Sequence, residues 1–285
     1  MSKAEDSDSD ETVTGSDSIS TARTINNEDV LIRANDMTKH YGGIVALDGI
    51  DIEIQENEIL SIVGDNGAGK STFIKLLSGV IPATRGDFFV KGGNGELEKV
   101  ILGSAADAQD AGIETVFQDM SLSKQHDVAA NVFMGREPLE DGPTGKLLRR
   151  INREYMNEKS VEALEEIGFE IDPTATTGDL SGGQQQAVAV ARALISDPDL
   201  VILDEPTAEV SVDGSQKILD LINSLQESGK TVLFVTHNME EVLDVADRIA
   251  ILRQGNLVTI LDNDGNVDRE DLVAYMTGAL TPDDH

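Results

Sequence analysis

The chain of 285 residues contains no cysteine and no tryptophan. Without cysteine it can form no disulfide framework, no thiolate metal site and no cysteine nucleophile, which excludes a small disulfide-bonded secreted fold. It also lacks the run of 18 or more apolar residues that a membrane-spanning helix requires. Its N-terminus is acidic, whereas a secretion signal is basic and then apolar. We therefore expect that the chain neither crosses a membrane nor is exported.

Basic residues are scarce: 22 Lys and Arg stand against 53 Asp and Glu, which gives a formal net charge of −31. The bases are spread along the chain, so nucleic acid, whose phosphates this charge repels, is not expected as a partner. Residues 1–29 hold only eight of the acids, so most of the negative charge belongs to the rest of the chain. Such a surface suits multimolar salt, where the Debye length falls to about 3 Å, and it predicts a salt-adapted, halophilic protein.

The composition changes near residue 29. Residues 1–28 are mostly Ser, Asp, Thr and Glu, and we expect a disordered acidic tail because they cannot bury enough apolar surface to offset the cost of ordering. The remaining residues 29–285 are long enough for one large α/β domain.

Apolar periodicity in that domain predicts an α/β fold. Residues 30–41 and 50–54 alternate apolar and polar side chains, as half-buried antiparallel strands do, and 58–64 is typical of a buried strand. Helical spacing follows over 71–81. After residue 181 helices and strands alternate, which predicts a mostly parallel sheet with flanking helices. Between about 120 and 180 the pattern becomes helical and predicts an inserted helical subdomain, in which Asp127 caps a helix over 128–135 and a long amphipathic helix spans 151–169.

A glycine-rich loop lies between the buried strand and the helix at 71–81. It matches G-x-x-x-x-G-K-S, whose backbone N–H groups enclose phosphate oxygens, whose lysine reaches the β- and γ-phosphates and whose serine hydroxyl ligates Mg²⁺. The loop therefore predicts binding of nucleotide phosphates together with Mg²⁺, and the family resemblance described below makes ATP the expected nucleotide. The nucleotide-binding residues predicted here are Gly64, Asp65, Asn66, Gly67, Ala68, Gly69, Lys70, Ser71 and Thr72.

Two carboxylates, Asp204 and Glu205, end the apolar run that begins at Leu200. Acids are costly inside a sheet unless they meet a cation, so their place next to a phosphate loop in the same chain indicates function. Asp204 fits a partner for Mg²⁺ or its water, and Glu205 fits a base that polarises the attacking water.

A third motif, LSGGQ, begins at Leu180 and precedes a helix, with the LDEP sequence about 20 residues further on. The order and spacing of phosphate loop, LSGGQ and LDEP resemble those of the nucleotide-binding subunits of ABC transporters, over about residues 30–280. The phosphate-loop helix, LSGGQQQAVAVARAL and AYMTGAL look most like the monosaccharide importer group. In this family the signature residues bind the γ-phosphate held by the opposite subunit of a dimer; here they are Ser181, Gly182, Gly183 and Gln184.

The resemblance carries over three further positions. Tyr41 falls where an aromatic ring stacks on adenine. Gln118 matches the glutamine that touches Mg²⁺ or water and joins the core to the helical insert, and His237 matches the histidine that contacts the γ-phosphate. The catalytic residues implied are thus Glu205, His237 and Gln118, and the metal ligands are Ser71, Gln118 and Asp204. One position departs from the common family pattern, because Ser211 stands where many members carry aspartate; importers of the monosaccharide group also lack it as a rule.

The function implied by the resemblance is that of an ATP-hydrolysing subunit which energises import of a monosaccharide such as glucose or ribose. It implies a homodimer on the cytoplasmic face of the membrane, docked on integral-membrane permease subunits and served indirectly by an extracytoplasmic sugar-binding protein. Alternatives are an ABC ATPase of an exporter or of lipid or lipoprotein release, or a soluble ATPase acting on ribosomes or DNA. The permease would dock on the helical insert, where Val128, Val132, Phe133 and Met134 are candidates for either the docking groove or the core.

Overall fold

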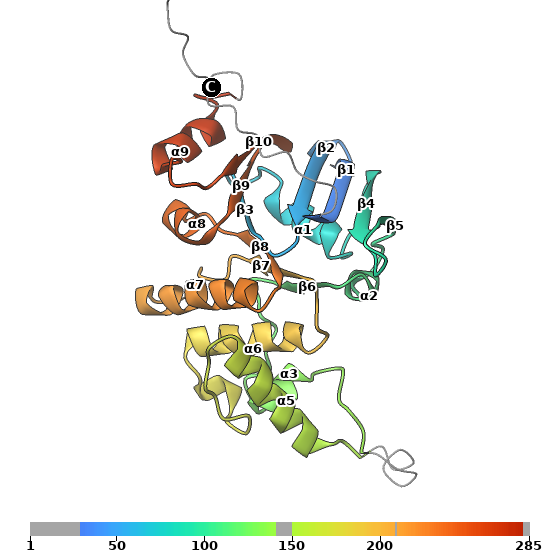
Figure 1. The fold of residues 1–285 in the computed structure, drawn as a ribbon, viewed down its shortest axis with the longest axis vertical. Coiled ribbons are helices and arrows are strands. Elements are labelled where there is room, and N and C mark those ends of the chain that lie inside the picture. Colours follow the sequence, from blue (N-terminus) through green and yellow to red (C-terminus); the bar gives the residue numbers. More distant parts are fainter. Residues whose placement is uncertain (1–28, 141–149, 209, 282–285) are drawn as a thin grey trace, which may run out of the picture.

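The computed structural model describes residues 29–140, 150–208 and 210–281 (Figure 1). The predicted disordered tail, residues 1–28, lies outside the described residues. An antiparallel sheet comes first in the chain and has the strand order β2-β1-β4-β5. Its strands are β1 (Val30–Tyr41), β2 (Ile44–Gln55), β4 (Arg85–Lys91) and β5 (Leu97–Val100).

The second sheet has six strands in the order β10-β9-β3-β8-β7-β6, and only the edge strand β10 runs antiparallel to its neighbour. This arrangement and the antiparallel sheet confirm the predicted fold class. The strands are β3 (Ile59–Val63), β6 (Ile113–Val116), β7 (Leu200–Asp204), β8 (Thr231–Val235), β9 (Arg248–Arg253) and β10 (Asn256–Asp262).

Helices cover both faces of the six-stranded sheet (Figure 1). They are α1 (Lys70–Leu77), α2 (Ala105–Asp110), α3 (Val128–Val132), α5 (Arg153–Glu166), α6 (Gly182–Leu194), α7 (Val212–Glu227), α8 (Met239–Val245) and α9 (Arg269–Thr277), with a short 3₁₀ turn, η2 (Thr177–Asp179). None of the helices in the described ranges combines the length and apolar character needed to cross a bilayer.

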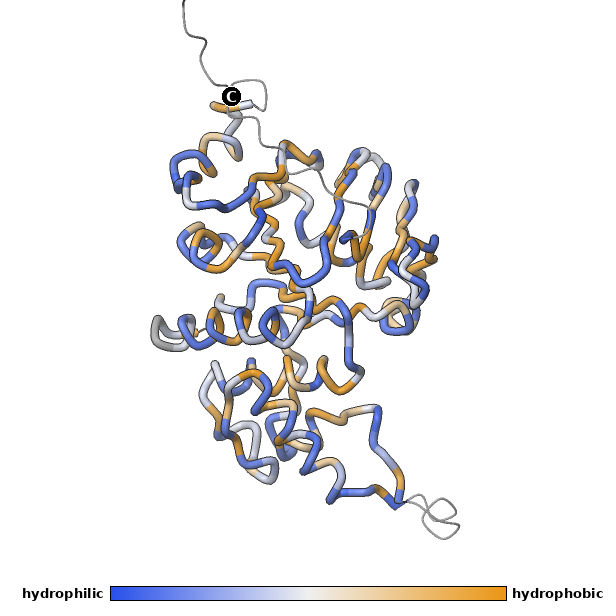
Figure 2. Tube along the Cα trace, viewed as in Figure 1, coloured by the Kyte–Doolittle hydropathy of each residue, from blue (hydrophilic) through white to orange (hydrophobic). Residues whose placement is uncertain are grey.

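The core consists of two clusters, one on each face of this sheet. Along β3, for example, Leu60 and Ile62 point into one cluster while Ile59 and Val63 point into the other, because successive strand residues face opposite sides. The first cluster joins α1 to the antiparallel sheet, and the second joins the sheet to α6, α7, α8 and α9. Figure 2 shows the hydrophobic segments along the central strands and the polar ones along outer helix turns and loops. The phosphate-loop helix and the helix that follows LSGGQ therefore lie on opposite faces of the sheet.

The helical insert differs from its sequence prediction in extent. Residues 117–127 are irregular and the first helix begins at Val128, with Asp127 as its N-cap as predicted; the Asp127 carboxylate accepts a hydrogen bond from the Ala130 N–H at 2.7 Å. The irregular stretch includes Ser121, which has a left-handed backbone with φ of 48° and interrupts any helix.

Three of the four candidate docking residues in the insert belong to the core. Val128, Val132 and Phe133 are buried, and only Met134 is exposed. The apolar spacing in this segment thus marks the side of α3 that packs against α5 and α6.

Candidate nucleotide-binding site

Four parallel strands of the six-stranded sheet end at the same edge, and the predicted phosphate-handling residues follow them. Going across the sheet, β3 leads into Gly64, β8 into His237, β7 ends at Asp204, and β6 leads toward Gln118. The register pairs Val235 with both Ile62 and Asp204, and Leu203 with Val116, so these ends lie level with one another. Ligands of open α/β sheets bind beyond the carboxyl ends of the strands, at this kind of edge.

The loop after β3 is a close-fitting turn that two glycines make possible. A Cβ on Gly64 would lie 2.3 Å from the Leu252 carbonyl oxygen, and a Cβ on Gly69 would lie 2.5 Å from Cδ2 of Leu47. Gly69 also has φ of 111°, which side-chain-bearing residues rarely adopt. Helix α1 begins directly after Gly69 and has no side-chain cap, which leaves its N-terminus suited to a phosphate group.

Lys70 is buried within this loop and is held by it. Its ammonium donates hydrogen bonds to the carbonyl oxygens of Gly64 at 2.5 Å and Asp65 at 3.3 Å. Burial lowers the pKa of Lys70, while the carboxylates of Glu205, Asp65 and Asp204 act in the opposite direction. The loop therefore positions a desolvated cation among acidic groups, where a phosphate would complete its coordination.

The two predicted carboxylates lie side by side at the end of β7. Burial raises the pKa of Asp204, and the neighbouring Glu205 carboxylate raises it further, while Lys75 and Lys70 lower it. A carboxylate whose pKa is raised by burial and by a neighbouring acid is typical of functional sites, where a cation or a substrate stabilises its charge.

Glu205 has an unusual backbone for its residue type. Its φ is 48°, in the left-handed region, and its N–H donates to the Val235 carbonyl oxygen at 2.8 Å. Glu205 Oε2 lies 3.6 Å from Nδ1 of the exposed His237. His237 is the residue that, by the family resemblance, contacts the γ-phosphate. Strained backbone at a functional carboxylate is a recurrent feature of active sites.

The donor groups at this edge fit a magnesium ion held together with a nucleotide. Ser71 and Asp204 supply hydroxyl and carboxylate oxygens, and within the described ranges no cluster of three His, Cys, Asp or Glu residues could hold a metal by itself. Mg²⁺ commonly takes one or two protein ligands and completes its shell with phosphate oxygens and water.

Gln118 is exposed two residues beyond β6 rather than within the strand. It lines a hollow of about 360 Å³ together with residues 119–122, Lys124 and Gln185 of α6. The structure thus places Gln118 at the same sheet edge as Asp204 and beside the helical insert.

Tyr41 lies at the end of β1, in the antiparallel sheet. Its ring is 45% exposed, and it pairs with Ile44 of β2. A little further along β2, Ala46 and Leu47 lie against Gly69 of the phosphate loop. The strand pair that carries Tyr41 therefore packs directly on the loop.

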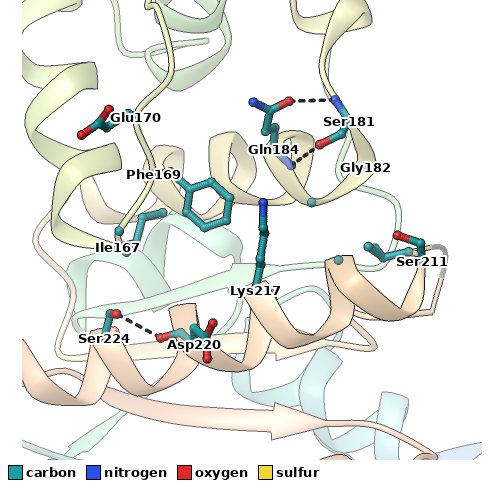
Figure 3. A pocket seen from close by; sticks show the side chains of 14 residues that line it. Ile167, Phe169, Glu170, Ser181, Gly182, Gln184, Ser211, Lys217, Asp220 and Ser224 are labelled. Carbon is teal, nitrogen blue, oxygen red and sulfur yellow. Dashed lines mark hydrogen bonds between the residues drawn. The ribbon is translucent and has the colours of Figure 1, made fainter.

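The LSGGQ residues form a separate anion-competent helix end (Figure 3). Ser181 caps α6 in a capping box: its N–H donates to the Gln184 side-chain oxygen at 3.0 Å, and its hydroxyl accepts from the Gln184 N–H at 3.4 Å. The signature residues line a cleft of about 850 Å³, together with residues 167–170 and the start of α7, including Ser211. Because α6 and α1 cover opposite faces of the sheet, one chain does not bring Ser181 to Lys70.

One buried group that supports the site was missed by sequence reasoning. The Glu241 carboxylate of α8 accepts hydrogen bonds from the hydroxyls of Thr207 at 2.8 Å and Thr236 at 3.1 Å. These threonines stand just after Glu205 and just before His237, so Glu241 fixes the two turns that present them. An acid in the first turn of a helix is ordinarily a surface residue, and nothing in its spacing distinguishes this one.

Comparison with known proteins places these motifs in one family. The family model described as ABC transporter matches residues 47–208, which include the phosphate loop, the LSGGQ motif and both carboxylates. The chain belongs to the ABC transporter family. Its curated relatives include the fructose import ATP-binding protein FrcA of Rhizobium meliloti, 38% identical over 90% of this chain and 96% of the relative.

Other relatives are also ATP-binding proteins named for sugar import. The xylose/arabinose import ATP-binding protein XylG of Sulfolobus acidocaldarius is 40% identical over 80% of this chain and 86% of its own length. The ribose import ATP-binding protein RbsA 1 of Rubrobacter xylanophilus is 36% identical over 87% of this chain, but only 47% of the relative is matched.

Solved structures show the same fold. A nucleotide-free ATP-binding cassette from an ABC transporter superposes with a TM-score of 0.72 at 26% identity, covering 86% of this chain and 98% of that one. A dimeric bacterial ABC transporter cassette gives 0.66 at 26% identity, covering 82% and 100%.

Proposed function

We propose that this chain is the ATP-hydrolysing subunit of an ABC importer for a monosaccharide. The observation that carries the proposal is the single sheet edge on which the buried Lys70, the Asp204–Glu205 pair and His237 stand together. The named fructose, xylose/arabinose and ribose import relatives support the transport class and the substrate class.

The roles we propose for these residues and for Tyr41 combine their surroundings with the resemblance to the family. The loop from Gly64 to Thr72 holds the phosphates of ATP, Tyr41 stacks on the base, and Lys70 pairs with the β- and γ-phosphates. Glu205 accepts a proton from the attacking water, and His237, 3.6 Å from its carboxylate, orients that water against the γ-phosphate.

The metal position follows from the same donors. Ser71 and Asp204 would hold Mg²⁺, with Gln118 reaching it directly or through water. When bound, Mg²⁺ neutralises charge on the phosphates. The positive charge of the ion would offset the repulsion between the carboxylates of Asp204 and Glu205.

A complete site requires two chains. Ser181 and the Gly182–Gly183 amides form a second phosphate-binding end, and it lies on the other face of the sheet from Lys70. In a homodimer, the LSGGQ residues of one chain would face the phosphate loop of the other, so that both phosphate-binding ends contact the same nucleotide. The dimeric cassette among the similar structures supports this arrangement. Ser211 lines the cleft next to the signature, so communication between the two sites uses a hydroxyl where many relatives have a carboxylate.

The remaining partners follow from the transport role. Residues 29–285 form one ATPase domain with a helical subdomain over about 120–180, and they dock at the cytoplasmic face of the membrane on permease subunits. An extracytoplasmic sugar-binding protein acts on the far side of that permease. The hollow beside the helical insert, lined by Lys124 and Gln185 among others, is the docking surface we favour.

The net charge of −31 supports a further part of the proposal, adaptation to high salt. A surface with this excess of carboxylates repels itself strongly in dilute buffer, and concentrated salt screens that repulsion.

Replacing Glu205 tests the catalytic assignment. A Glu205→Gln protein keeps the shape of the site but loses the base, so we expect ATP affinity close to that of the unsubstituted chain and a fall in hydrolysis of about a hundredfold or more. Phosphate release under saturating MgATP measures the rate. The matched control is Glu240→Gln, which removes one exposed carboxylate from α8. Hydrolysis by Glu205→Gln at the rate of the control would refute the role of Glu205.

A further inference from the structure

Lys39 in β1 makes two contacts, one with the segment that follows α1 and one with Tyr41 of its own strand. Its ammonium donates a hydrogen bond to the Pro82 carbonyl oxygen at 2.6 Å, and the same nitrogen lies 5.2 Å from the centroid of the Tyr41 ring. The second distance is within the range of a cation–π contact, in which the ammonium faces the negative face of the ring. Tyr41 is thus in contact with a cation that is itself anchored.

The surrounding hydrogen bonds make this anchor firm. The Thr84 N–H donates to the Thr38 carbonyl oxygen at 2.8 Å, and the Thr84 hydroxyl accepts from the His40 N–H at 3.0 Å. Residues 82–84 follow α1, the helix that begins at the phosphate loop. The end of β1 is therefore fixed to both ends of the phosphate-loop helix, through these bonds and through the contact of β2 with Gly69.

Lys39 stands opposite a residue of β2 that packs on the phosphate loop. It stands opposite Leu47 of β2, and residues directly opposite each other on antiparallel strands share a face. The Leu47 side chain lies against Gly69, where an added Cβ would be only 2.5 Å from Leu47 Cδ2. Lys39 thus stands opposite the residue that packs on Gly69, and its ammonium reaches the Pro82 carbonyl oxygen beside the Tyr41 ring.

We propose that Lys39 is a positioning residue for the adenine base, which it serves by holding the Tyr41 ring from one face and leaving the other face for the base. The inference rests on the proposed ATP-binding role of Tyr41. A half-exposed ring that is already held loses less freedom when a base stacks on it, so binding is tighter than to a free ring. The anchoring bond to Pro82 ties the ring orientation to the helix that binds the phosphates.

The test compares a ligand that has a base with one that lacks it. Calorimetric titration of the full chain with MgADP and with magnesium pyrophosphate gives both dissociation constants without turnover. For Lys39→Met we expect MgADP to bind about threefold more weakly, the effect of losing one exposed cation–π contact, and magnesium pyrophosphate to bind unchanged. In steady-state hydrolysis the KM for ATP should rise by a similar factor while kcat stays the same.

Further variants separate the cation from a general effect on the fold. Lys39→Arg keeps a positive charge that can stack on the ring and donate to Pro82, and it should restore MgADP affinity. Lys39→Gln keeps a hydrogen-bond donor without the charge, and we expect it to weaken MgADP binding as much as Lys39→Met does. It replaces Lys39→Met in the test if that variant does not fold. Lys99→Met, in β5 of the same sheet, removes an exposed lysine paired with Asp87 and should leave both affinities unaltered.

Two results would overturn the assignment of Lys39. One is MgADP affinity that does not change in Lys39→Met; the other is an equal loss for MgADP and magnesium pyrophosphate, which would mean that Lys39 acts through the phosphate loop. If the unsubstituted chain binds neither ligand, the proposed function itself fails, and that outcome is distinct from both.

Discussion

Gly67 and Gly69 stand two positions apart in the phosphate loop, and both have a left-handed backbone, with φ of 83° and 111°. Their surroundings differ. A Cβ on Gly67 would meet no atom within 4 Å, whereas one on Gly69 would lie 2.5 Å from Leu47 and 2.9 Å from the Ala46 carbonyl oxygen. Gly67 is needed for its backbone conformation alone. Gly69 is needed for its conformation and also because β2 approaches it closely.

This difference predicts unequal costs for the same substitution. Gly69→Ala should lower the free energy of unfolding by about 2–4 kcal/mol, because it combines left-handed strain with a collision against β2. Gly67→Ala, the matched control, should cost about 1 kcal/mol, from the backbone alone. Urea denaturation followed by circular dichroism measures both. Equal losses in the two variants would show that the contact with Leu47 and Ala46 is not restrictive.

At the same scale, the motifs and the family resemblance predicted which residues stand at this sheet edge, but not a buried residue that supports them. Lys70, Asp204 and His237 belong to short patterns whose chemistry is fixed by residue type, and the sheet places them at one edge. Glu241 has no such pattern. Its role arises only because α8 brings it to Thr207 and Thr236, residues that are distant from one another in sequence.

At the scale of the elements, one buried carboxylate of β6, that of Glu114, bonds to the segments that follow helices α3 and α6. Glu114 of β6 accepts hydrogen bonds from Arg136, just after α3, at 2.6 Å and from the Ser196 hydroxyl, just after α6, at 2.7 Å. The Glu114 side chain is 9% exposed. Because Gln118 follows the same strand, this junction sets where the helical layer stands relative to Gln118.

Removing that carboxylate should cost more than removing a surface one. We expect Glu114→Ala to lower the free energy of unfolding by about 2 kcal/mol, because it removes the carboxylate partner of the part-buried Arg136 guanidinium, while the Ser196 hydroxyl keeps the Ala193 carbonyl oxygen as acceptor. Glu162→Ala, which breaks an exposed pair with Lys159 on α5, should change stability by less than about 0.5 kcal/mol. Thermal or urea unfolding measures both, and similar losses would mean that the Glu114 junction does not stabilise the fold.

Element prediction succeeded where apolar runs were long and failed where other signals decided. The strands β3, β7 and β8 are buried along nearly their whole length, and their sequences show it. Helix α9 was missed, although Asp268 and Asp271 form a capping box and Gly278 ends the helix in a left-handed conformation. Residues 120–127 fall within the segment, about 120–180, that the sequence predicted as helical, and in the structure they contain no helix.

For the whole molecule, the charge of −31 predicts how stability responds to salt. Repulsion among carboxylates opposes the compact state in dilute buffer, and screening at multimolar KCl removes it, so Tm should rise as KCl increases from low to multimolar concentration. Scanning calorimetry measures the rise. Sucrose is the control, because it stabilises compact proteins by exclusion from their surface without screening charge. A Tm that is highest in low salt would contradict salt adaptation.

At the scale of the whole molecule, the phosphate loop and the LSGGQ helix end lie on opposite faces of the sheet, and the proposed function therefore depends on the pairing of two chains. Sedimentation velocity of the Glu205→Gln protein, in which we expect bound ATP to persist, tests this pairing. We predict a monomer without nucleotide and with MgADP, a dimer with MgATP, and a return to monomer when Ser181→Arg is added to the ATP-bound protein. A monomer that binds MgATP, or a dimer that forms regardless of ATP and of Ser181, would contradict the account.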